Sequence, residues 1–335
     1  MTTADAAPVL VTGASGFIGG ALVDGLVAAG RPVRALVRSA DAAPALRGRG
    51  AEPVTGDVLD PAGLARAAAG CSVVYHAAGV NTFCLADPTP MKLVNVDGSV
   101  NVIAAAAACG VGKVVYTSSA AALGEVPGTV GSESSPHRGW FLSAYEQTKY
   151  QAEREVLREA AVRGVEVVCV SPSSVQGPGR LHGTARLLLG YLNGSLKFLV
   201  DTRTSFLDIA DCTAGHLLAE QHGKPGERYV LNGSTFTTRE LIGIVASTTG
   251  IQRRVSWLPG RAAMAAATVV EAGARAARRK PPVCREMMRT LLNGHIYDGS
   301  RAERELGLHY TPVEETITRT LRWYSDHGYL AAGRR

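Results

Sequence analysis

The sequence predicts an α/β protein with a Rossmann-type, doubly wound parallel sheet and a smaller, mostly helical C-terminal lobe. Three observations predict this class. Short β-branched runs alternate with longer helical runs through the first half of the 335-residue chain. The strand-like runs are continuously apolar, as in a parallel sheet that helices cover on both faces. Beyond residue 172 the strand signals become sparse.

The first half contains six expected strands and four expected helices. The strands are expected at residues 8–12, 33–37, 52–56, 72–76, 113–119 and 165–171. The helices are expected at residues 16–30, 60–70, 91–110 and 145–164. The first, third and fourth helices end in glycine after an apolar-periodic stretch, which is a helix stop signal. We therefore expect one domain at 1–171 and mainly a second lobe at 172–335, with one strand at about 228–232 returning to the sheet.

Composition argues against several classes of protein. The formal net charge is +6 and the basic residues are spread along the chain, so nucleic acid is not an expected partner. Six cysteines form no CxxC pair, and several lie in apolar runs where a reduced cysteine acts as a small hydrophobe. Histidine and cysteine spacings predict no metal site. No run of about 18 apolar residues predicts a membrane-spanning helix, and the N-terminus lacks a signal-peptide pattern. We expect a cytoplasmic protein.

A glycine-rich turn with G-x-x-G-x-x-G spacing joins the first expected strand to the first helix. Glycine permits positive φ and lets the backbone approach a pyrophosphate without a Cβ in the way. The N-terminus of the following helix offers free N–H groups and a partial positive charge. In this strand-turn-helix context we predict a dinucleotide site in preference to a plain turn. The contacts are expected from Gly13, Ser15, Gly16, Phe17, Ile18 and Gly19.

Two later strand ends support this site. Asp57 and Val58 follow the third strand, where a carboxylate would meet the adenine amino group. The alternative for Asp57 is an Asx turn or a helix cap. Ala77, Ala78 and Gly79 follow the fourth strand and are small enough to lie flat beside a cofactor, with a tight strand exit as the alternative.

The end of the second strand selects the dinucleotide. Ribose hydroxyls are usually held by an acid about 20 residues beyond the glycine turn, whereas a 2′-phosphate calls for arginine. Val37 occupies the acidic place and Arg38 follows it. A guanidinium suits a phosphate by geometry and charge. We therefore predict NADP(H), with NAD(H) served by Asp41 as the alternative.

Tyr145 and Lys149 lie four residues apart, on one face of an expected helix. A nearby ammonium would lower the pKa of the tyrosine, so that the phenol exchanges a proton with a substrate oxygen near neutral pH. Ser118 and Ser119 end the fifth strand, and a serine hydroxyl there would bind the same oxygen. The alternative is an ordinary exposed pair on a helix.

The motifs TGASGFIG, GDVLD, HAAG, TSS and YEQTK, in this order, resemble those of the extended short-chain dehydrogenase/reductase family, which includes NAD-dependent epimerases and dehydratases. Within it the likeness is closest to the dihydroflavonol-reductase-like and the hopanoid-associated sugar-epimerase-like groups. The resemblance extends over nearly the whole chain, through NVDGSVNV, SPSSVQGPG, FLDIADCTAGHLLA and GERYVLNG.

The resemblance implies a Ser–Tyr–Lys triad. Tyr145 would be the acid/base, Lys149 would bind the nicotinamide ribose, and Ser119 matches the family serine better than Ser118. Asn95 resembles the helix asparagine of the proton relay, with a capping or core role as the alternative. The resemblance also implies a homodimer. It implies further cofactor contacts from Thr117, Pro172, Ser173 and Val175.

The predicted function is an NADP(H)-dependent reductase of a ketone or aldehyde, or a dehydrogenase of a secondary alcohol, acting on a small apolar or aromatic metabolite. Trp140, Phe141 and Tyr191 are candidate substrate contacts beside Ser119, with structural roles as the alternative. An NAD-dependent nucleotide-sugar epimerase or dehydratase is the first alternative function. A non-catalytic dinucleotide sensor is the second, and the intact serine, tyrosine and lysine argue against it. The alanine-rich stretch 261–275 is expected to be a packed core helix, with a lid, an interface or a shallow membrane contact as alternatives.

Overall fold

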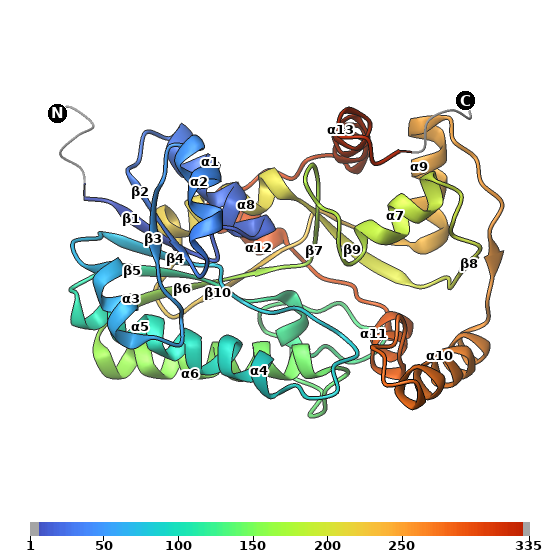
Figure 1. Ribbon diagram of the computed structural model, residues 1–335, viewed down its shortest axis with the longest axis horizontal. Coiled ribbons are helices and arrows are strands. Elements are labelled where there is room, and N and C mark those ends of the chain that lie inside the picture. Colours follow the sequence, from blue (N-terminus) through green and yellow to red (C-terminus); the bar gives the residue numbers. More distant parts are fainter. Residues whose placement is uncertain (1–6, 331–335) are drawn as a thin grey trace.

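A seven-stranded, fully parallel sheet lies at the centre of the larger lobe of the protein (Figure 1). The computed structural model describes residues 7–330. The N-terminal segment, for which no signal peptide is predicted, therefore lies mostly outside the described residues. The predicted doubly wound fold is confirmed. Across the sheet the strands run β10 (Arg228–Leu231), β6 (Glu166–Pro172), β5 (Lys113–Thr117), β4 (Val73–His76), β1 (Val9–Thr12), β2 (Val33–Val37) and β3 (Glu52–Thr55).

Helices cover both faces of this sheet because successive side chains of each buried strand point to opposite faces. In β1, Val9 and Val11 pack into one core, and Leu10 packs into the other. The first core is closed by α1 (Phe17–Ala28), α2 (Ala43–Gly48), α8 (Ile209–His222) and α12 (Ser300–Leu306). The second core is closed by α3 (Pro61–Ala68), α5 (Gly98–Ala108) and α6 (Ala144–Arg163).

The helix that carries Tyr145 and Lys149 has defined signals at both ends. Ser143 caps α6, because its Oγ accepts a hydrogen bond from the Glu146 backbone N–H at 3.1 Å. Gly164 ends the helix with φ of +69°, a left-handed conformation that glycine adopts without strain. The Ser143 cap fixes the start of α6 at Ala144, one residue before Tyr145.

The helix expected at 91–110 is divided into three pieces. It comprises α4 (Thr89–Lys92), a π-helical turn η3 (Leu93–Asp97) and α5. Turns of π-helix inside longer helices are frequent at functional sites. This one contains Asn95, which was predicted as a relay residue.

The C-terminal lobe contains more strands than the sequence predicts. Five short ones form two small sheets, and they are brief enough to give little periodicity. One sheet contains β11 (Ser234–Thr237), β9 (Arg203–Asp208) and β7 (Ser174–Gln176), and the other contains β12 (Ser256–Trp257) and β8 (Phe198–Leu199). The helices of a third core are α7 (Ala185–Leu192), α9 (Thr238–Thr249) and α13 (Val313–Asp326). The division of the chain at residue 171 stays a prediction.

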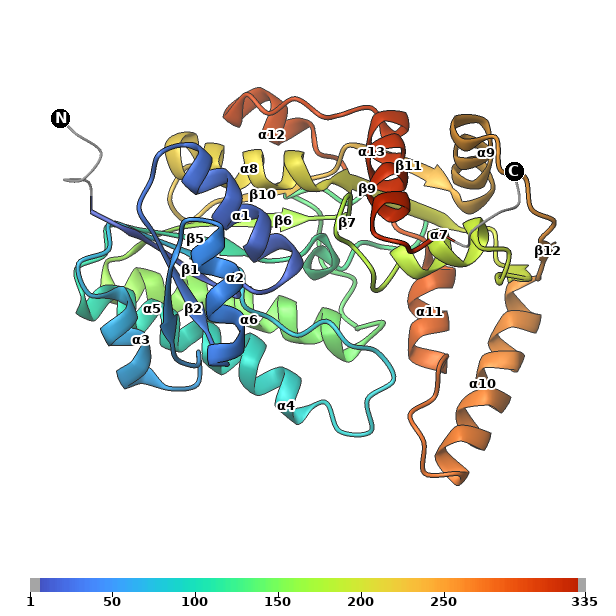
Figure 2. The same ribbon diagram turned by 45° about the horizontal axis from the view of Figure 1, so that its top comes forward.

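The alanine-rich stretch is not a core helix, so that expectation is wrong. It forms α10 (Gly260–Ala276), which pairs with α11 (Arg285–Asn293) in an arm that projects from the C-terminal lobe (Figure 2). Only Ala263, Ala267 and Glu271 of α10 are buried, because the arm packs chiefly on itself. Within residues 7–330, no helix combines the length and the apolar character needed to cross a membrane.

A disulfide between Cys84 and Cys284 joins the arm to the loop that follows β4. The sequence predicts no such pair, because the two cysteines lie 200 residues apart. The same junction contains Glu286 of α11, whose carboxylate accepts hydrogen bonds from the backbone N–H of Cys84 at 3.1 Å and of Ala144 at 2.7 Å. The start of α11 therefore holds both the β4 loop and the first turn of α6.

We expect the disulfide to stabilise the folded chain, because it closes a long loop in the unfolded state. Replacing both partners (Cys84→Ser with Cys284→Ser) should lower the free energy of unfolding by about 2–4 kcal/mol without reductant, and should change nothing when dithiothreitol is present. Urea unfolding measures this. Cys109→Ser, at a free and only partly buried thiol, is the matched control. Six titratable thiols in denatured, unreduced protein, instead of four, would contradict the pairing.

Candidate active site

The glycine turn packs directly against the turn that follows β4. Gly13 has φ of +69°, and a Cβ placed on it would lie 2.6 Å from the backbone nitrogen of Ala78. A Cβ on Gly19 would lie 2.1 Å from the Gly13 carbonyl oxygen. These two glycines are therefore required by the fold itself. Gly16 and Gly79 differ, since a Cβ on either would meet only one neighbouring atom, at 3.1 Å and 3.4 Å.

This open side fits the diphosphate of a dinucleotide. β1 lies between β2 and β4, which is where the order of the strands reverses and where doubly wound sheets bind their ligands. The first turn of α1 begins at Gly16 without a side-chain cap and contains no acidic residue, so it leaves a positive helix end for an anion. The buried Ser173 Oγ has no hydrogen-bond partner and offers a further polar contact.

The predicted adenosine contacts lie at the ends of β2 and β3. Val37 is buried, and the next residue, Arg38, is exposed. Asp41 accepts a hydrogen bond from the Ser39 hydroxyl at 2.9 Å. Asp57 forms an Asx turn, in which its Oδ1 accepts from the Leu59 N–H at 2.9 Å. The Asx turn that is the alternative for Asp57 is thus present. It uses Oδ1 and does not involve the second carboxylate oxygen of Asp57.

A buried chain of hydrogen bonds starts at the end of β1 and crosses the end of β4. The Thr12 hydroxyl contacts His76 Nδ1 at 2.7 Å, and His76 Nε2 contacts the Ser99 hydroxyl at 2.9 Å. Ser99 donates to the Asn95 carbonyl oxygen at 2.6 Å, so it must accept from Nε2–H. Burial, together with the charge of Lys149, lowers the pKa of His76 to about 3. The imidazole is therefore neutral, with its proton on Nε2, and Nδ1 accepts from Thr12.

Asn95 connects this chain to the catalytic helix. Its Oδ1 accepts from the Val80 N–H at 2.7 Å, and its Nδ2 donates to the Val80 carbonyl at 2.9 Å and to Thr148 Oγ1 at 3.0 Å. Thr148 in turn donates to the Tyr145 carbonyl at 2.9 Å. Both polar atoms of the Asn95 amide therefore have hydrogen-bond partners, as expected of a residue that positions its neighbours.

Lys149 is a buried cation with partners on β5. Its Nζ donates to the Thr117 carbonyl at 2.7 Å and to the Tyr116 hydroxyl at 3.4 Å. Burial lowers the pKa of Lys149 to about 8, although the carboxylate of Glu153 opposes this shift. At neutral pH the ammonium is charged and close to deprotonation.

The side chains of Ser119 and Arg180 both act on the Tyr145 phenol. Burial raises the pKa of Tyr145, and the Ser119 hydrogen bond and the Arg180 guanidinium oppose that rise. Arg180 is thus a cation that lowers the pKa of the phenol. Lys149 Nζ donates to the Thr117 carbonyl, and its effect on Tyr145 stays a prediction. Ser118 Oγ is buried without a partner, and only Ser119 reaches the tyrosine.

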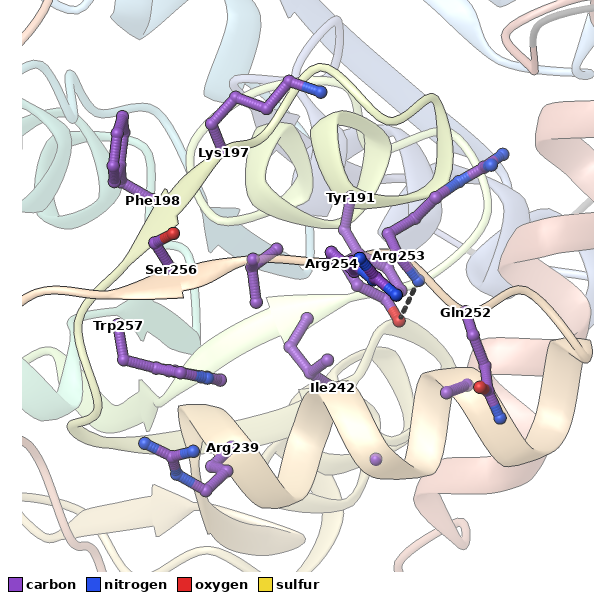
Figure 3. Close-up of a pocket in the computed structure, with 13 residues that line it drawn as sticks. Tyr191, Lys197, Phe198, Arg239, Ile242, Gln252, Arg253, Arg254, Ser256 and Trp257 are labelled. Carbon is purple, nitrogen blue, oxygen red and sulfur yellow. Dashed lines mark hydrogen bonds between the residues drawn. The ribbon is translucent and has the colours of Figure 1, made fainter.

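The other predicted substrate residues, Trp140, Phe141 and Tyr191, have contacts of their own within the protein. Trp140 is 47% exposed beneath the Arg138 guanidinium, and Phe141 packs against His137 and Tyr150. Tyr191 is 2% exposed, and its hydroxyl bonds to the backbone of residues 251 and 253. It borders a pocket of about 720 Å³ in the C-terminal lobe (Figure 3), whose wall contains none of the predicted cofactor or triad residues.

Sequence reasoning missed several residues of the site. His76 stands in the HAAG motif, but only the three residues after it were singled out. Arg180 follows the GPG segment, and Glu286 lies 142 residues after the helix start that it holds. Within residues 7–330, no group of three or more His, Cys, Asp or Glu side chains is placed to hold a metal ion.

Comparison with known proteins bears on this geometry. Residues 9–231 match the model of the NAD dependent epimerase/dehydratase family. A Synechocystis sp. protein provisionally named a dihydroflavonol 4-reductase is 32% identical, over 96% of this chain and 95% of its own. The 2-alkyl-3-oxoalkanoate reductase of Stenotrophomonas maltophilia is 30% identical, over 93% of this chain and 97% of its own. The crystal structure of gox2253 superposes with a TM-score of 0.86 at 31% identity, covering 97% of this chain and all of that one.

We expect Lys149→Met to stabilise the cofactor-free protein, because it removes a buried charge. The pKa of Lys149 in the folded protein, about 8, lies below its ordinary value of 10.5, so the unfolded chain binds this proton more tightly. Wild-type stability therefore rises as pH increases from about 8 to 10.5. The variant should be more stable by about 2 kcal/mol below pH 8, with the difference shrinking above it.

Urea unfolding of both proteins at pH 7 and pH 10 measures this difference. Lys92→Met, at an exposed lysine of α4, is the control and should show no such pH dependence. Destabilisation of the Lys149 variant at both pH values would mean that the bond to Thr117 outweighs the cost of burying the charge.

Proposed function

Because the chain belongs to the NAD dependent epimerase/dehydratase family and is an NAD(P)-dependent oxidoreductase of the extended short-chain dehydrogenase/reductase type, we propose that it reduces a ketone or aldehyde with NADPH. The observation that carries this proposal is the Tyr145 phenol, on which the Ser119 hydroxyl acts, with Lys149 on the same helix. A tyrosine whose pKa is raised keeps its proton at neutral pH, which suits the donor in a reduction.

The chemistry divides between the cofactor and the chain. Bound NADPH supplies a hydride to the carbonyl carbon. Ser119 donates a hydrogen bond to the carbonyl oxygen and holds it next to the Tyr145 hydroxyl. Tyr145 transfers its proton to that oxygen as negative charge develops there, which yields the alcohol. The Arg180 guanidinium stabilises the phenolate until solvent reprotonates it.

A ketone with apolar alkyl or aryl groups is the proposed substrate class. The S. maltophilia relative is named for reducing a 2-alkyl-3-oxoalkanoate, which has a ketone, alkyl groups and a carboxylate, and the Synechocystis relative also has a reductase name. Both names support reduction over sugar epimerisation. The homodimer and the cytoplasmic location stay predictions from the sequence.

The preference for NADPH rests on Arg38. No acid stands at the end of β2, where Val37 is buried, and Asp41 is engaged by Ser39. The exposed Arg38 guanidinium suits a 2′-phosphate.

We expect Arg38→Ala to weaken NADPH binding by about 10- to 100-fold and to leave NADH binding unchanged, because only NADPH presents the phosphate. Fluorescence titration of nucleotide-free protein measures both affinities. Arg163→Ala, at the far end of α6 from Tyr145, is the control and should alter neither. Tightly retained NAD in the purified protein would contradict the NADPH preference and support the epimerase alternative.

The proposed reaction is tested by Tyr145→Phe. Loss of the proton donor should reduce turnover with a panel of alkyl and aryl ketones by about 10²- to 10⁴-fold. NADPH affinity should change little, because the ring remains in place. Tyr150→Phe, one turn further along α6, is the matched control and should keep wild-type turnover. If the Tyr145 variant retained most of its activity, the assigned proton transfer would be wrong.

A further inference from the structure

Arg180 lies where the two lobes meet at the glycine turn. It follows β7 on the segment that enters the C-terminal lobe. Its guanidinium carbon lies 5.3 Å from the centre of the Phe17 ring, and Phe17 is the first residue of α1. The Tyr324 hydroxyl of α13 donates to the Arg180 carbonyl at 2.7 Å and so holds this backbone from the other lobe. The side chain is thereby directed toward the cofactor turn.

The same guanidinium also faces the proton donor. It lies close enough to the Tyr145 hydroxyl for each group to alter the pKa of the other, lowering that of the phenol and raising that of the arginine. Arg180 thus contacts the first residue of α1 and also acts electrostatically on the predicted proton donor.

Arg180 has no acidic partner in the described part of the chain. None of the ion pairs among residues 7–330 involves it, and its buried Nε has no hydrogen-bond partner. The titratable groups that interact with it are Tyr145, Tyr324 and Cys212, which are uncharged at neutral pH. The Arg180 side chain is half-buried. Withdrawing a guanidinium from water without an anion is costly, whereas bidentate pairing with a carboxylate is among the strongest polar contacts in proteins. The geometry calls for an anion supplied by a ligand.

We propose that Arg180 binds a carboxylate of the substrate, which makes the substrate a 3-oxo acid whose carboxylate lies one carbon from the reacting ketone. This inference rests on the proposed reductase function. With the ketone oxygen held by Ser119 and Tyr145, the carboxylate of such a substrate pairs with Arg180, whose planar guanidinium donates two parallel hydrogen bonds to it. Arg180 thereby selects acids over esters and simple ketones.

The first experiment uses the wild-type protein with NADPH and compares a freshly prepared 2-alkyl-3-oxo acid with its methyl ester. The acid should show a KM at least about tenfold lower than the ester. Reduction of the ester with equal or better kcat/KM would overturn the role of Arg180 while leaving the reductase function intact. Reduction of neither compound, together with tightly retained NAD, would overturn the proposed function itself.

The second experiment uses Arg180→Met, Arg180→Lys and the control Arg186→Met, at an exposed arginine of α7. The methionine variant should raise the KM for the acid by about 10- to 100-fold and change that for the ester little, with partial rescue by lysine and no effect of the control. Thermal unfolding and NADPH titration establish that the variants fold. A loss of NADPH affinity would assign Arg180 to the cofactor diphosphate instead. Equal losses of kcat/KM for the acid and the ester, together with a shifted pH profile, would assign Arg180 to Tyr145 alone. Either of these two results, the loss of NADPH affinity or the equal losses, overturns the proposal.

Discussion

The buried hydrogen-bond chain from Thr12 to Thr148 fixes the position of the catalytic helix relative to the cofactor turn. Each link has one donor and one acceptor, because burial keeps His76 neutral and Ser99 donates to the Asn95 carbonyl. The chain begins at the strand end that precedes the glycine turn and finishes beneath Tyr145. Unsatisfied groups at this depth are costly, so the network admits one arrangement of β1, β4, η3 and α6. The position of Tyr145 relative to the glycine turn therefore depends on this network.

Two cations, the buried Lys149 and the half-buried Arg180, have different attachments. Lys149 is secured to the β5 backbone through Thr117, whereas Arg180 has no fixed anionic partner. Burying either charge reduces the stability of the empty protein, and a bound ligand offsets that cost. Such strained charges are characteristic of functional sites. In the proposed site, Lys149 is held by the protein backbone, whereas Arg180 is available to a ligand.

The C-terminal lobe is fastened to this frame at the residues that precede Tyr145. Glu286 holds the Ala144 N–H, and Arg289 donates to the Leu142 carbonyl. The Cys84–Cys284 disulfide joins the same arm to the loop after β4. The loop that leads into α6 is therefore supported from a helix about 140 residues later in the chain. This explains why α11 packs here although none of its residues is fully buried.

The sequence by itself determined the sheet, the glycine turn and the Tyr145–Lys149 helix. These follow from local periodicity, from glycines whose Cβ would collide with backbone, and from an i, i+4 spacing. It failed for the short strands of the second lobe and for α10, whose alanines predict burial but lie on an arm. Only the tertiary structure decided that Arg180 faces Tyr145, that Lys149 is directed toward Thr117, and that Cys84 meets Cys284. Local sequence determines which helices and strands form. The charge, burial and pairing of a side chain also depend on segments that are far away in the sequence but close in the fold. The spacing of residues along the chain contains no information about those contacts.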